Sequence, residues 1–371
     1  MLKSLRSVMG LQQSGLLLVI VLLGLVLWVF SGRHAEMRAG PHGAQVTVQV
    51  HNFYNAKSLM DTATEASFFA IMAVGATMVI ISGGIDLSVG AIYALSGVLT
   101  ALALRAWGAH NWPAGAMVPA AMALCLGTGL FCGWLNGQMA VGLRVHPFII
   151  TLGTMWVFRG IAFVSSKAES VLVPEQLTRV AKASLGLRSD LRPVPLLLTV
   201  LVAAAGALYL TRTVMGRHVY AVGGNPEASR FAGLRLGRIY VSVYMISGLM
   251  AGLAALLGSS YYGAAACGDA EGYELYVIAS AVVGGASLAG GRGSAVGAVL
   301  GALLIVLIRQ SIRQLNFDTN YTWIIVGVAV ILAVVLDQLN ARLAARRLAQ
   351  AAAAAREKEA AAAHPGEERG S

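Results

Sequence analysis

The sequence predicts an all-α protein, a polytopic membrane bundle of about ten transmembrane helices with both termini on the cytoplasmic side. Of the 371 residues, 57% are hydrophobic and 12% are charged, and the mean hydropathy is +0.71. An average soluble domain has about 25% charged residues, so most of this chain cannot face water. Ten crossings of about 20 apolar residues use about 200 residues, which leaves room for loops and tails but not for a large catalytic domain.

The apolar runs along the chain define the expected spans. The first run, Leu16 to Phe30, follows the basic residues Lys3 and Arg6. A signal peptide has a similar charged start but a shorter apolar stretch, so we expect an uncleaved first helix. Unpaired backbone groups are costly in lipid, so all the runs should be helices. The further spans are expected at about Ala66 to Ser82, Ala91 to Leu104, Met117 to Leu135, Pro147 to Ser165, Pro195 to Leu210, Ile239 to Leu257, Leu275 to Leu288, Ser294 to Ile308 and Tyr321 to Leu339.

The distribution of Lys and Arg sets the orientation, because cytoplasmic loops carry an excess of both. With the N-terminus inside, the inner segments hold the larger share, and Arg309 and Arg313 on the outer side fit least well. We therefore predict a transmembrane domain over residues 1–340 that includes a cytoplasmic loop over residues 211–238. Residues 341–371 should form an Ala-rich charged cytoplasmic tail, disordered or partly helical.

Several classes of protein are disfavoured by motifs that the sequence lacks. No lysine follows a glycine, so there is no G-x-x-x-x-G-K-[ST] phosphate loop, and HExxH and G-x-S-x-G are absent too. Cys125, Cys132 and Cys267 form no CxxC pair, so neither a disulfide framework nor a metal cluster is expected. The net charge of +10 lies between apolar runs, which favours anionic lipid headgroups over nucleic acid as its counter-surface. We expect no catalytic residue, cofactor or metal in this chain, and a role in translocation.

A short helix outside the bilayer is predicted after the sixth span, from about Pro226 to Ala232. Asn225 is a good N-cap, Pro226 suits the first helical position, and Glu227 falls in the first turn, where the helix dipole favours an anion. Gly233 suits the C-terminal stop.

This short helix would expose Arg230 and Phe231, a cation and an apolar side chain of the kind that a docking helix needs. The alternative is that the segment only closes a long loop against the bundle. The pattern alone does not separate the two interpretations.

A second polar segment, Ile81 to Ala91, joins two spans and carries Asp86 and Ser88. An ionisable residue near membrane depth is costly unless it faces a partner or water. Asp86 therefore either lines a polar pathway or caps the following helix, and Ser88 shares either role; we favour the cap. The Gly-Gly and Val-Gly-Ala pattern of this segment recurs between Gly290 and Ala298, a hint of duplicated architecture.

Arg159 is the third polar position, inside the span from Pro147 to Ser165. Its side chain binds a polar substrate, pairs with Asp86 or snorkels to the outer surface. We favour snorkelling.

Four stretches, in order, carry a resemblance to a known family. They are AVGATMVI leading into GGIDLSVGA (residues 73–91), HPFIITLGT with Arg159 and Gly160, GRHVYAVGGNPEASRFAG (residues 216–233), and GYEL at residues 272–275 with VVGGASLAGGRGS (residues 282–294). With this spacing the chain resembles, over roughly Ser58 to Asp337, the permease subunits of bacterial ATP-binding-cassette (ABC) sugar importers, the ribose, xylose and galactofuranose group of a branched-chain-permease-like superfamily.

The resemblance implies a multi-pass protein of the bacterial inner membrane that works as a homodimer or heterodimer of permeases. Its partners would be cytoplasmic ATPase subunits, which hold ATP and Mg, and a periplasmic solute-binding protein that docks on the outer loops Lys167 to Arg192 and Gly258 to Glu274. By analogy, the segment after the sixth span is the coupling helix that enters a groove on the ATPase. Its residues are Gly223, Gly224, Asn225, Pro226, Glu227, Arg230, Phe231 and Gly233.

Three features depart from the family pattern: the extended first outer loop from Arg33 to Lys57, the outer Arg309 and Arg313, and the tail from Arg342. Two other classes of function remain open. An ion-driven secondary transporter would need an intramembrane ion site, for which Asp86 is the candidate carboxylate. A polytopic scaffold or intramembrane enzyme would show no transport and no ATPase partner.

Overall fold

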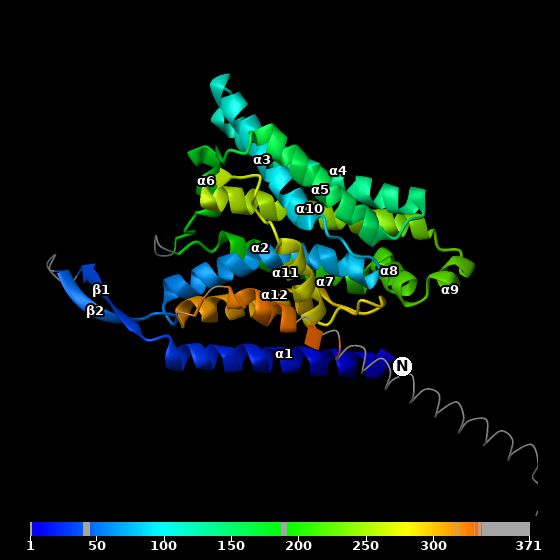
Figure 1. Ribbon diagram of the computed structural model, residues 1–371, viewed down its shortest axis with the longest axis horizontal. Coiled ribbons are helices and arrows are strands. Elements are labelled where there is room, and N and C mark those ends of the chain that lie inside the picture. The colour runs from blue at the N-terminus through cyan, green and yellow to red at the C-terminus, as the bar shows by residue number, and fades with distance from the viewer. Residues whose placement is uncertain are drawn as a thin grey trace, which may run out of the picture.

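The computed structural model describes residues 2–39, 45–186, 191–315, 317–318, 320–329, 331–332 and 335 (Figure 1). The expected tail over residues 341–371 lies outside the described residues. The described elements are α1 (Leu2–Phe30), β1 (Arg33–Ala39), β2 (Gln45–His51), α2 (Ala56–Ile81), α3 (Val89–Ala109), α4 (Ala114–Leu143), α5 (Pro147–Ser166), β3 (Val171–Leu172), α6 (Glu175–Ala181), α7 (Val194–Arg212), α8 (Val214–Gly224), α9 (Pro226–Phe231), α10 (Leu236–Tyr262), β4 (Ala264–Ala265), α11 (Tyr273–Val283) and α12 (Ala295–Gln314).

The described part of the chain contains seven helices long and apolar enough to cross a membrane, namely α2, α3, α4, α5, α7, α10 and α12. Two shorter apolar helices, Ser14–Phe30 within α1 and α11, coincide with two further expected spans. The tenth expected span, Tyr321 to Leu339, is helical over residues 321–329 and leaves the described residues soon after. The all-α membrane bundle is therefore confirmed.

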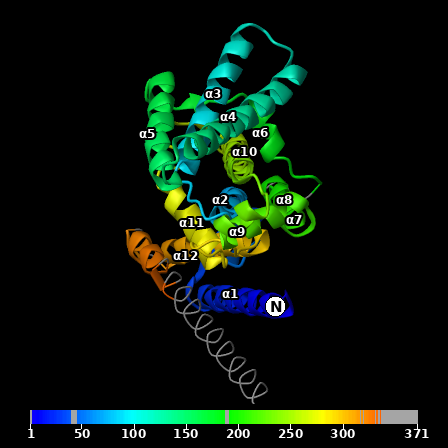
Figure 2. The ribbon, with the colours of Figure 1, turned by 90° about the vertical axis from the view of Figure 1, so that its right-hand side faces the viewer.

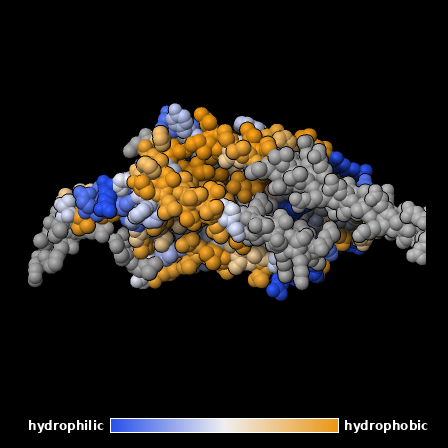
Figure 3. Space-filling model, turned by 90° about the horizontal axis from the view of Figure 1, so that it is seen from below, coloured by the Kyte–Doolittle hydropathy of each residue, from blue (hydrophilic) through white to orange (hydrophobic). Residues whose placement is uncertain are grey.

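The bundle is organised around α2, which is almost wholly buried and packs against α7, α10, α11 and α12. Figures 1 and 2 show α1 along the base, α12 and α2 above it, and α3, α4, α5 and α10 as the upper layer. Apolar residues cover the middle of the face seen in Figure 3, and hydrophilic residues gather toward its ends. This distribution suits a protein whose flanks contact lipid.

The upper layer is held by a close crossing of α4 and α10. A Cβ added at Gly133 would lie 2.9 Å from the carbonyl carbon of Tyr244, and one added at Gly252 would lie 2.7 Å from the carbonyl oxygen of Cys125. Small residues at such positions let two backbones approach closely, which is how helices associate without a hydrophobic driving force between them in lipid. The crossing fixes α10 relative to α4 and so places Ser247, a site residue described below.

The first expected outer loop, Arg33 to Lys57, contains an element that the hydropathy pattern did not predict. Strands β1 and β2 pair as an antiparallel hairpin, with Arg33 opposite His51. The local signal is the alternation of valine with polar residues in β2, which is typical of a strand. In Figure 1 this hairpin lies at one end of the molecule, and α9 and the N-terminus lie at the other.

Arg309 and Arg313, the two arginines that were expected on the outer side and fitted the charge distribution least, have a partner on α2. The carboxylate of Glu65 lies 3.3 Å from Arg309 Nη1 and 2.6 Å from Arg313 Nη2. Arg309 also lies over the rings of Phe69 and Tyr276, at 5.4 and 5.2 Å from their centroids. A paired cation on aromatic faces needs no contact with the cytoplasm, so these arginines do not oppose the orientation.

Candidate functional site

The segment after α7 folds as two consecutive helices, each started by a side-chain cap. Thr213 accepts a hydrogen bond from the backbone N–H of Gly216 at the start of α8, and Asn225 accepts one from Ala228 at the start of α9. Pro226 occupies the first position of α9. Gly233, with φ of +82°, ends it in the left-handed region that glycine tolerates best. The short helix expected at Pro226 to Ala232 is confirmed.

The side chain that the sequence singled out for docking is the most exposed large apolar residue described. Phe231 is 91% exposed, whereas Ser229 on the opposite side of α9 is buried. In Figure 2, which looks onto this end of the molecule, α9 lies in front of the bundle. The helix therefore does not bury its apolar side chain against its own bundle, and the docking role stays a prediction.

The expected loop over residues 211–238 is more ordered than predicted, because α8 fills its first half. The half-buried face of α8 places Val219, Val222 and Gly223 against the bundle. Sequence reasoning missed this helix because its two terminal glycines and its arginine and histidine interrupt the apolar pattern.

At the same end, α2 stops at Ile81 and the chain returns into the bundle without helical structure over residues 84–88 before α3 begins. Tyr244 donates a hydrogen bond to the carbonyl oxygen of Ile85 at 3.1 Å, and Thr151 donates another to the same oxygen at 3.3 Å. Irregular backbone at membrane depth is tolerated only inside protein or beside water. Here the hydroxyl groups of Tyr244 and Thr151 satisfy the carbonyl oxygen of Ile85.

Asp86 is the centre of this irregular segment and is 2% exposed. One carboxylate oxygen accepts hydrogen bonds from the Ser88 amide at 3.0 Å and the Ser88 hydroxyl at 2.6 Å, and the other accepts from the Ser247 hydroxyl at 2.8 Å. Asn136 Nδ2 donates to the Ser88 hydroxyl at 2.7 Å. Because Ser247 lies near the middle of α10, Asp86 sits halfway along the bundle and ties the irregular segment to α10.

This geometry corrects the favoured interpretation of Asp86 as a helix cap. The N-cap of α3 is Ser88, whose side chain makes no capping bond. Asp86 accepts the amide of Ser88 itself, a local turn two residues long, and its second oxygen binds a different helix. The sequence offered no signal for Ser247 or Asn136, since a single serine or asparagine in an apolar span has many possible partners.

Arg159 is also buried, at 9% exposed, and the snorkelling interpretation is wrong. Its Nη1 donates to the carbonyl oxygens of Cys267 at 2.8 Å and Asp269 at 2.6 Å. The guanidinium therefore holds the loop between β4 and α11, and Asp86 is not among its partners.

That loop is part of the segment Gly258 to Glu274, which was expected as one outer loop; the structure corrects its form, and its docking role stays a prediction. Residues 258–262 belong to α10, and Ala265, Cys267 and Ala270 are buried. A Cβ added at Gly90, in the first turn of α3, would lie 2.5 Å from the carbonyl oxygen of Ala270 and 2.7 Å from Glu274 Oε2. The starts of α3 and α11 thus meet inside the bundle.

We expect Arg159→Met to lower the stability of the purified protein by about 2 kcal/mol, because it leaves two buried carbonyl oxygens without their donor. Arg159→Lys should recover part of the loss. The lysine ammonium can donate to a carbonyl oxygen, but its flexible stem does not fix its donors as the planar guanidinium does. Thermal unfolding in detergent measures both. Arg179→Met is the matched control, because Arg179 is exposed and pairs with Glu175 one turn away in its own helix. Equal losses for Arg159→Met and Arg179→Met would contradict the assignment.

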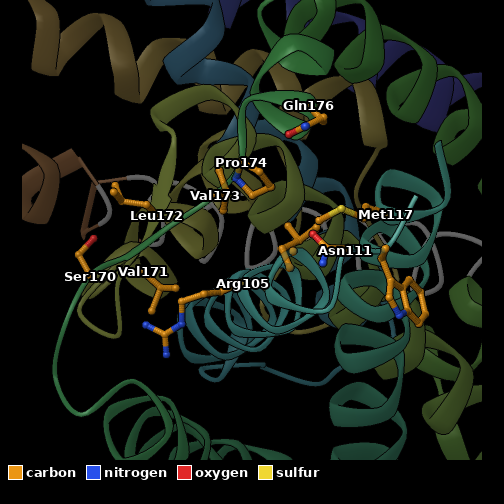
Figure 4. Close-up of a pocket in the computed structure, with 12 residues that line it drawn as sticks. Arg105, Asn111, Met117, Ser170, Val171, Leu172, Val173, Pro174 and Gln176 are labelled. Atoms are coloured by element: carbon orange, nitrogen blue, oxygen red, sulfur yellow. The ribbon is translucent and has the colours of Figure 1, made fainter. Parts of the chain in front are cut away.

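A groove of about 690 Å³ opens where the end of α3 and the start of α4 face the segment from Ser170 to Gln176 (Figure 4). Its polar lining includes Arg105, Asn111 and Gln176. The segment is part of the other expected outer docking loop, Lys167 to Arg192. Among the described residues, no group of three or more His, Cys, Asp or Glu side chains is placed to hold a metal ion.

Comparison with known proteins identifies the family of this chain. Residues 58–335 match the family described as branched-chain amino acid transport system / permease component. The chain belongs to this permease family. The match begins in the first turn of α2, so α1 and the β1–β2 hairpin of the permease lie outside it.

Three relatives of the permease carry sugar-related names. It is 36% identical over 247 residues to the ribose import permease protein of Escherichia coli (strain K12), covering 66% of this chain and 74% of that protein. It is 36% identical over 243 residues to the D-allose transport system permease protein of the same strain, covering 65% and 71%. It is 32% identical over 253 residues to the fructose import permease protein of Rhizobium meliloti, covering 66% and 68%. The permease is therefore a transport component and a multi-pass inner-membrane protein.

Proposed function

We propose that the permease is the membrane-spanning subunit of an ABC importer for a sugar or a sugar-like polar solute. The ribose, allose and fructose import permeases among its relatives support the solute class. The interior supports it too: a neutral solute needs no paired charges along its path, and Asp86 is bound by hydroxyl and amide donors instead of a cation.

The observation that carries the proposal is the exposed Phe231 on a capped helix at the end of the bundle. An aromatic side chain 91% exposed on a rigid helix, with Arg230 beside it, suits insertion into a groove of a partner protein. We assign that groove to a cytoplasmic ATPase subunit, because this chain has no phosphate loop of its own. ATP and Mg would then be held by the partner.

The orientation follows from this assignment. The end that carries α9 and the N-terminus faces the cytoplasm, and the end with the β1–β2 hairpin faces outward (Figure 1). The groove beside Ser170 to Gln176 lies at the outward end of α3 and is the proposed docking place of the solute-binding protein. A second permease subunit, identical or homologous, completes the assembly.

Co-purification and uptake test the proposal together. The permease is expressed together with candidate ATPase and solute-binding proteins from the same genome, and the ATPase should be recovered with it from detergent. Uptake of labelled ribose, allose, fructose and inositol is then compared in cells treated with an uncoupler and in cells depleted of ATP. If uptake is lost on ATP depletion but not with the uncoupler, the result supports the ABC importer. If uptake is lost with the uncoupler but not on ATP depletion, and no ATPase is bound, the permease is a secondary transporter.

A further inference from the structure

The end of α8 makes an unusually close backbone contact with the end of α2. A Cβ added at Gly223 would overlap the carbonyl oxygen of Ile81 and would lie 2.7 Å from the amide nitrogen of Gly291. The amide of Gly291 donates to that same Ile81 carbonyl at 2.8 Å. Three segments distant in sequence therefore meet at Gly223 with no side chain between them.

The turn between α11 and α12 contacts α8 from its own side. A Cβ added at Gly290, whose φ is +84°, would lie 2.6 Å from the carbonyl oxygen of Gly223, and one added at Gly291 would lie 2.9 Å from the Cα of Gly224. The hydroxyl of Tyr220, one turn earlier on α8, donates to the carbonyl oxygen of Gly293 at 2.8 Å. A tyrosine hydroxyl carries its proton at neutral pH, and burial raises the pKa of the Tyr220 phenol further.

Both partners of α8 lead to the two interrupted spans, by which we mean α3 and α11, the helices that begin inside the bundle after non-helical chain. From Ile81 the chain continues into the irregular segment that holds Asp86 in mid-bundle. From the turn at Gly290 and Gly291 it connects to α11, whose first turn meets Gly90 of α3. On the other side, α8 continues through Asn225, the shared cap residue, into α9.

We propose that Gly223 is a positioning residue through which movement of the docking helix α9 is transmitted to the ends of both interrupted spans. The inference rests on the proposed function, in which α9 meets the ATPase. Close-packed interiors have low compressibility, so segments in backbone contact move together instead of absorbing a displacement. A side chain at Gly223 separates α8 from Ile81 and Gly291 and breaks the transmission, while the exposed surface of α9 is unchanged.

A glycine outside the docking segment provides a matched control. A Cβ at Gly142 in α4 meets nothing within 4 Å. In the complete importer, Gly223→Ala should reduce solute uptake about tenfold or more, because the added methyl group overpacks a backbone contact, and Gly142→Ala should transport normally. Both variants should retain the ATPase during purification, and Gly223→Ala should hydrolyse ATP without stimulation by the loaded binding protein.

A reporter on the turn separates transmission from general damage. Ala289 is exposed next to Gly290, and the three native cysteines are buried, so Ala289→Cys accepts a single spin label. ATP with vanadate should change the label's spectrum in the otherwise unaltered importer and in the Gly142→Ala background, and leave it unchanged in the Gly223→Ala background. A purely structural defect would alter the spectrum before nucleotide is added.

Where Gly223→Ala fails to insert, Tyr220→Phe carries the test, because it removes one hydrogen bond and adds no atom. Its loss of uptake should be about three- to tenfold, against no loss in Tyr240→Phe. The inference is overturned if Gly223→Ala shows normal uptake and normal ATPase stimulation. It is also overturned if Tyr220→Phe and Tyr240→Phe show equal uptake. Loss of the ATPase from Gly223→Ala also overturns it, since the residue would then act in docking. Absence of the ATPase from the unaltered permease instead refutes the proposed function.

Discussion

Replacing Phe231 by aspartate should abolish ATP-dependent uptake while membrane insertion and the amount of permease stay unchanged. Phe231 is 91% exposed, so the substitution removes no contact within the permease. In the proposed complex the ring is buried in a groove of the ATPase, and full burial of a phenylalanine contributes about 1.5–3 kcal/mol. A carboxylate in that groove adds its own desolvation cost, so the affinity of the ATPase should fall about 100-fold or more.

Three measurements check this result: recovery of the ATPase with the permease, stimulation of ATP hydrolysis by the loaded binding protein, and uptake. Phe231→Leu is the control, because it keeps an apolar side chain and should retain most activity. Gly233→Pro should resemble Phe231→Asp, since proline cannot adopt the φ of +82° found there. Normal uptake and ATPase stimulation in Phe231→Asp and Gly233→Pro would remove α9 from the coupling mechanism.

Replacing Asp86 by alanine should cause the largest loss of stability of any single substitution at the site. The change leaves the Ser88 amide, the Ser88 hydroxyl and the Ser247 hydroxyl without their shared acceptor in the buried interior. Each unsatisfied buried donor costs about 1–3 kcal/mol, so a total of about 3 kcal/mol or more is expected. Asp86→Asn keeps one acceptor oxygen and should lose less.

Thermal unfolding in detergent and uptake in cells measure the effect of the Asp86 variants. Asp61→Ala is the control, because Asp61 is exposed and accepts a long hydrogen bond of 3.3 Å from Tyr261. Uptake should fall with stability in Asp86→Ala. If Asp86→Ala unfolds at the temperature of the Asp61→Ala control, the hydrogen-bond network does not hold the interrupted span.

Features that depend on local signals were predictable from the sequence. The span expected from Pro147 to Ser165 is α5, Pro147–Ser166, because a proline at the first helical position and a continuous apolar run fix it locally. The short helix after Asn225 was equally predictable, since its cap, its first-turn proline and its terminal glycine all lie within nine residues of sequence.

Features that depend on long-range contacts were not predictable from the sequence. Asp86 binds a serine 161 positions away and Arg159 binds carbonyl oxygens more than 100 positions away, so nothing local to either residue identifies the partner. The span expected from Leu275 to Leu288 is the shorter α11, which ends at Val283, where Gly284 packs against the backbone of Gly297 in α12. The strand β2 carried a local signal, but its valines do not form a long apolar run.

The accessibility of position 231 tests the central claim most directly. Phe231→Cys gives one exposed thiol, because Cys125, Cys132 and Cys267 are buried. A membrane-impermeant maleimide should leave this thiol unmodified in spheroplasts, label it in inside-out vesicles stripped of the ATPase, and fail to label it once the ATPase is restored. Labelling in intact spheroplasts would place α9 outside the cell and contradict the account.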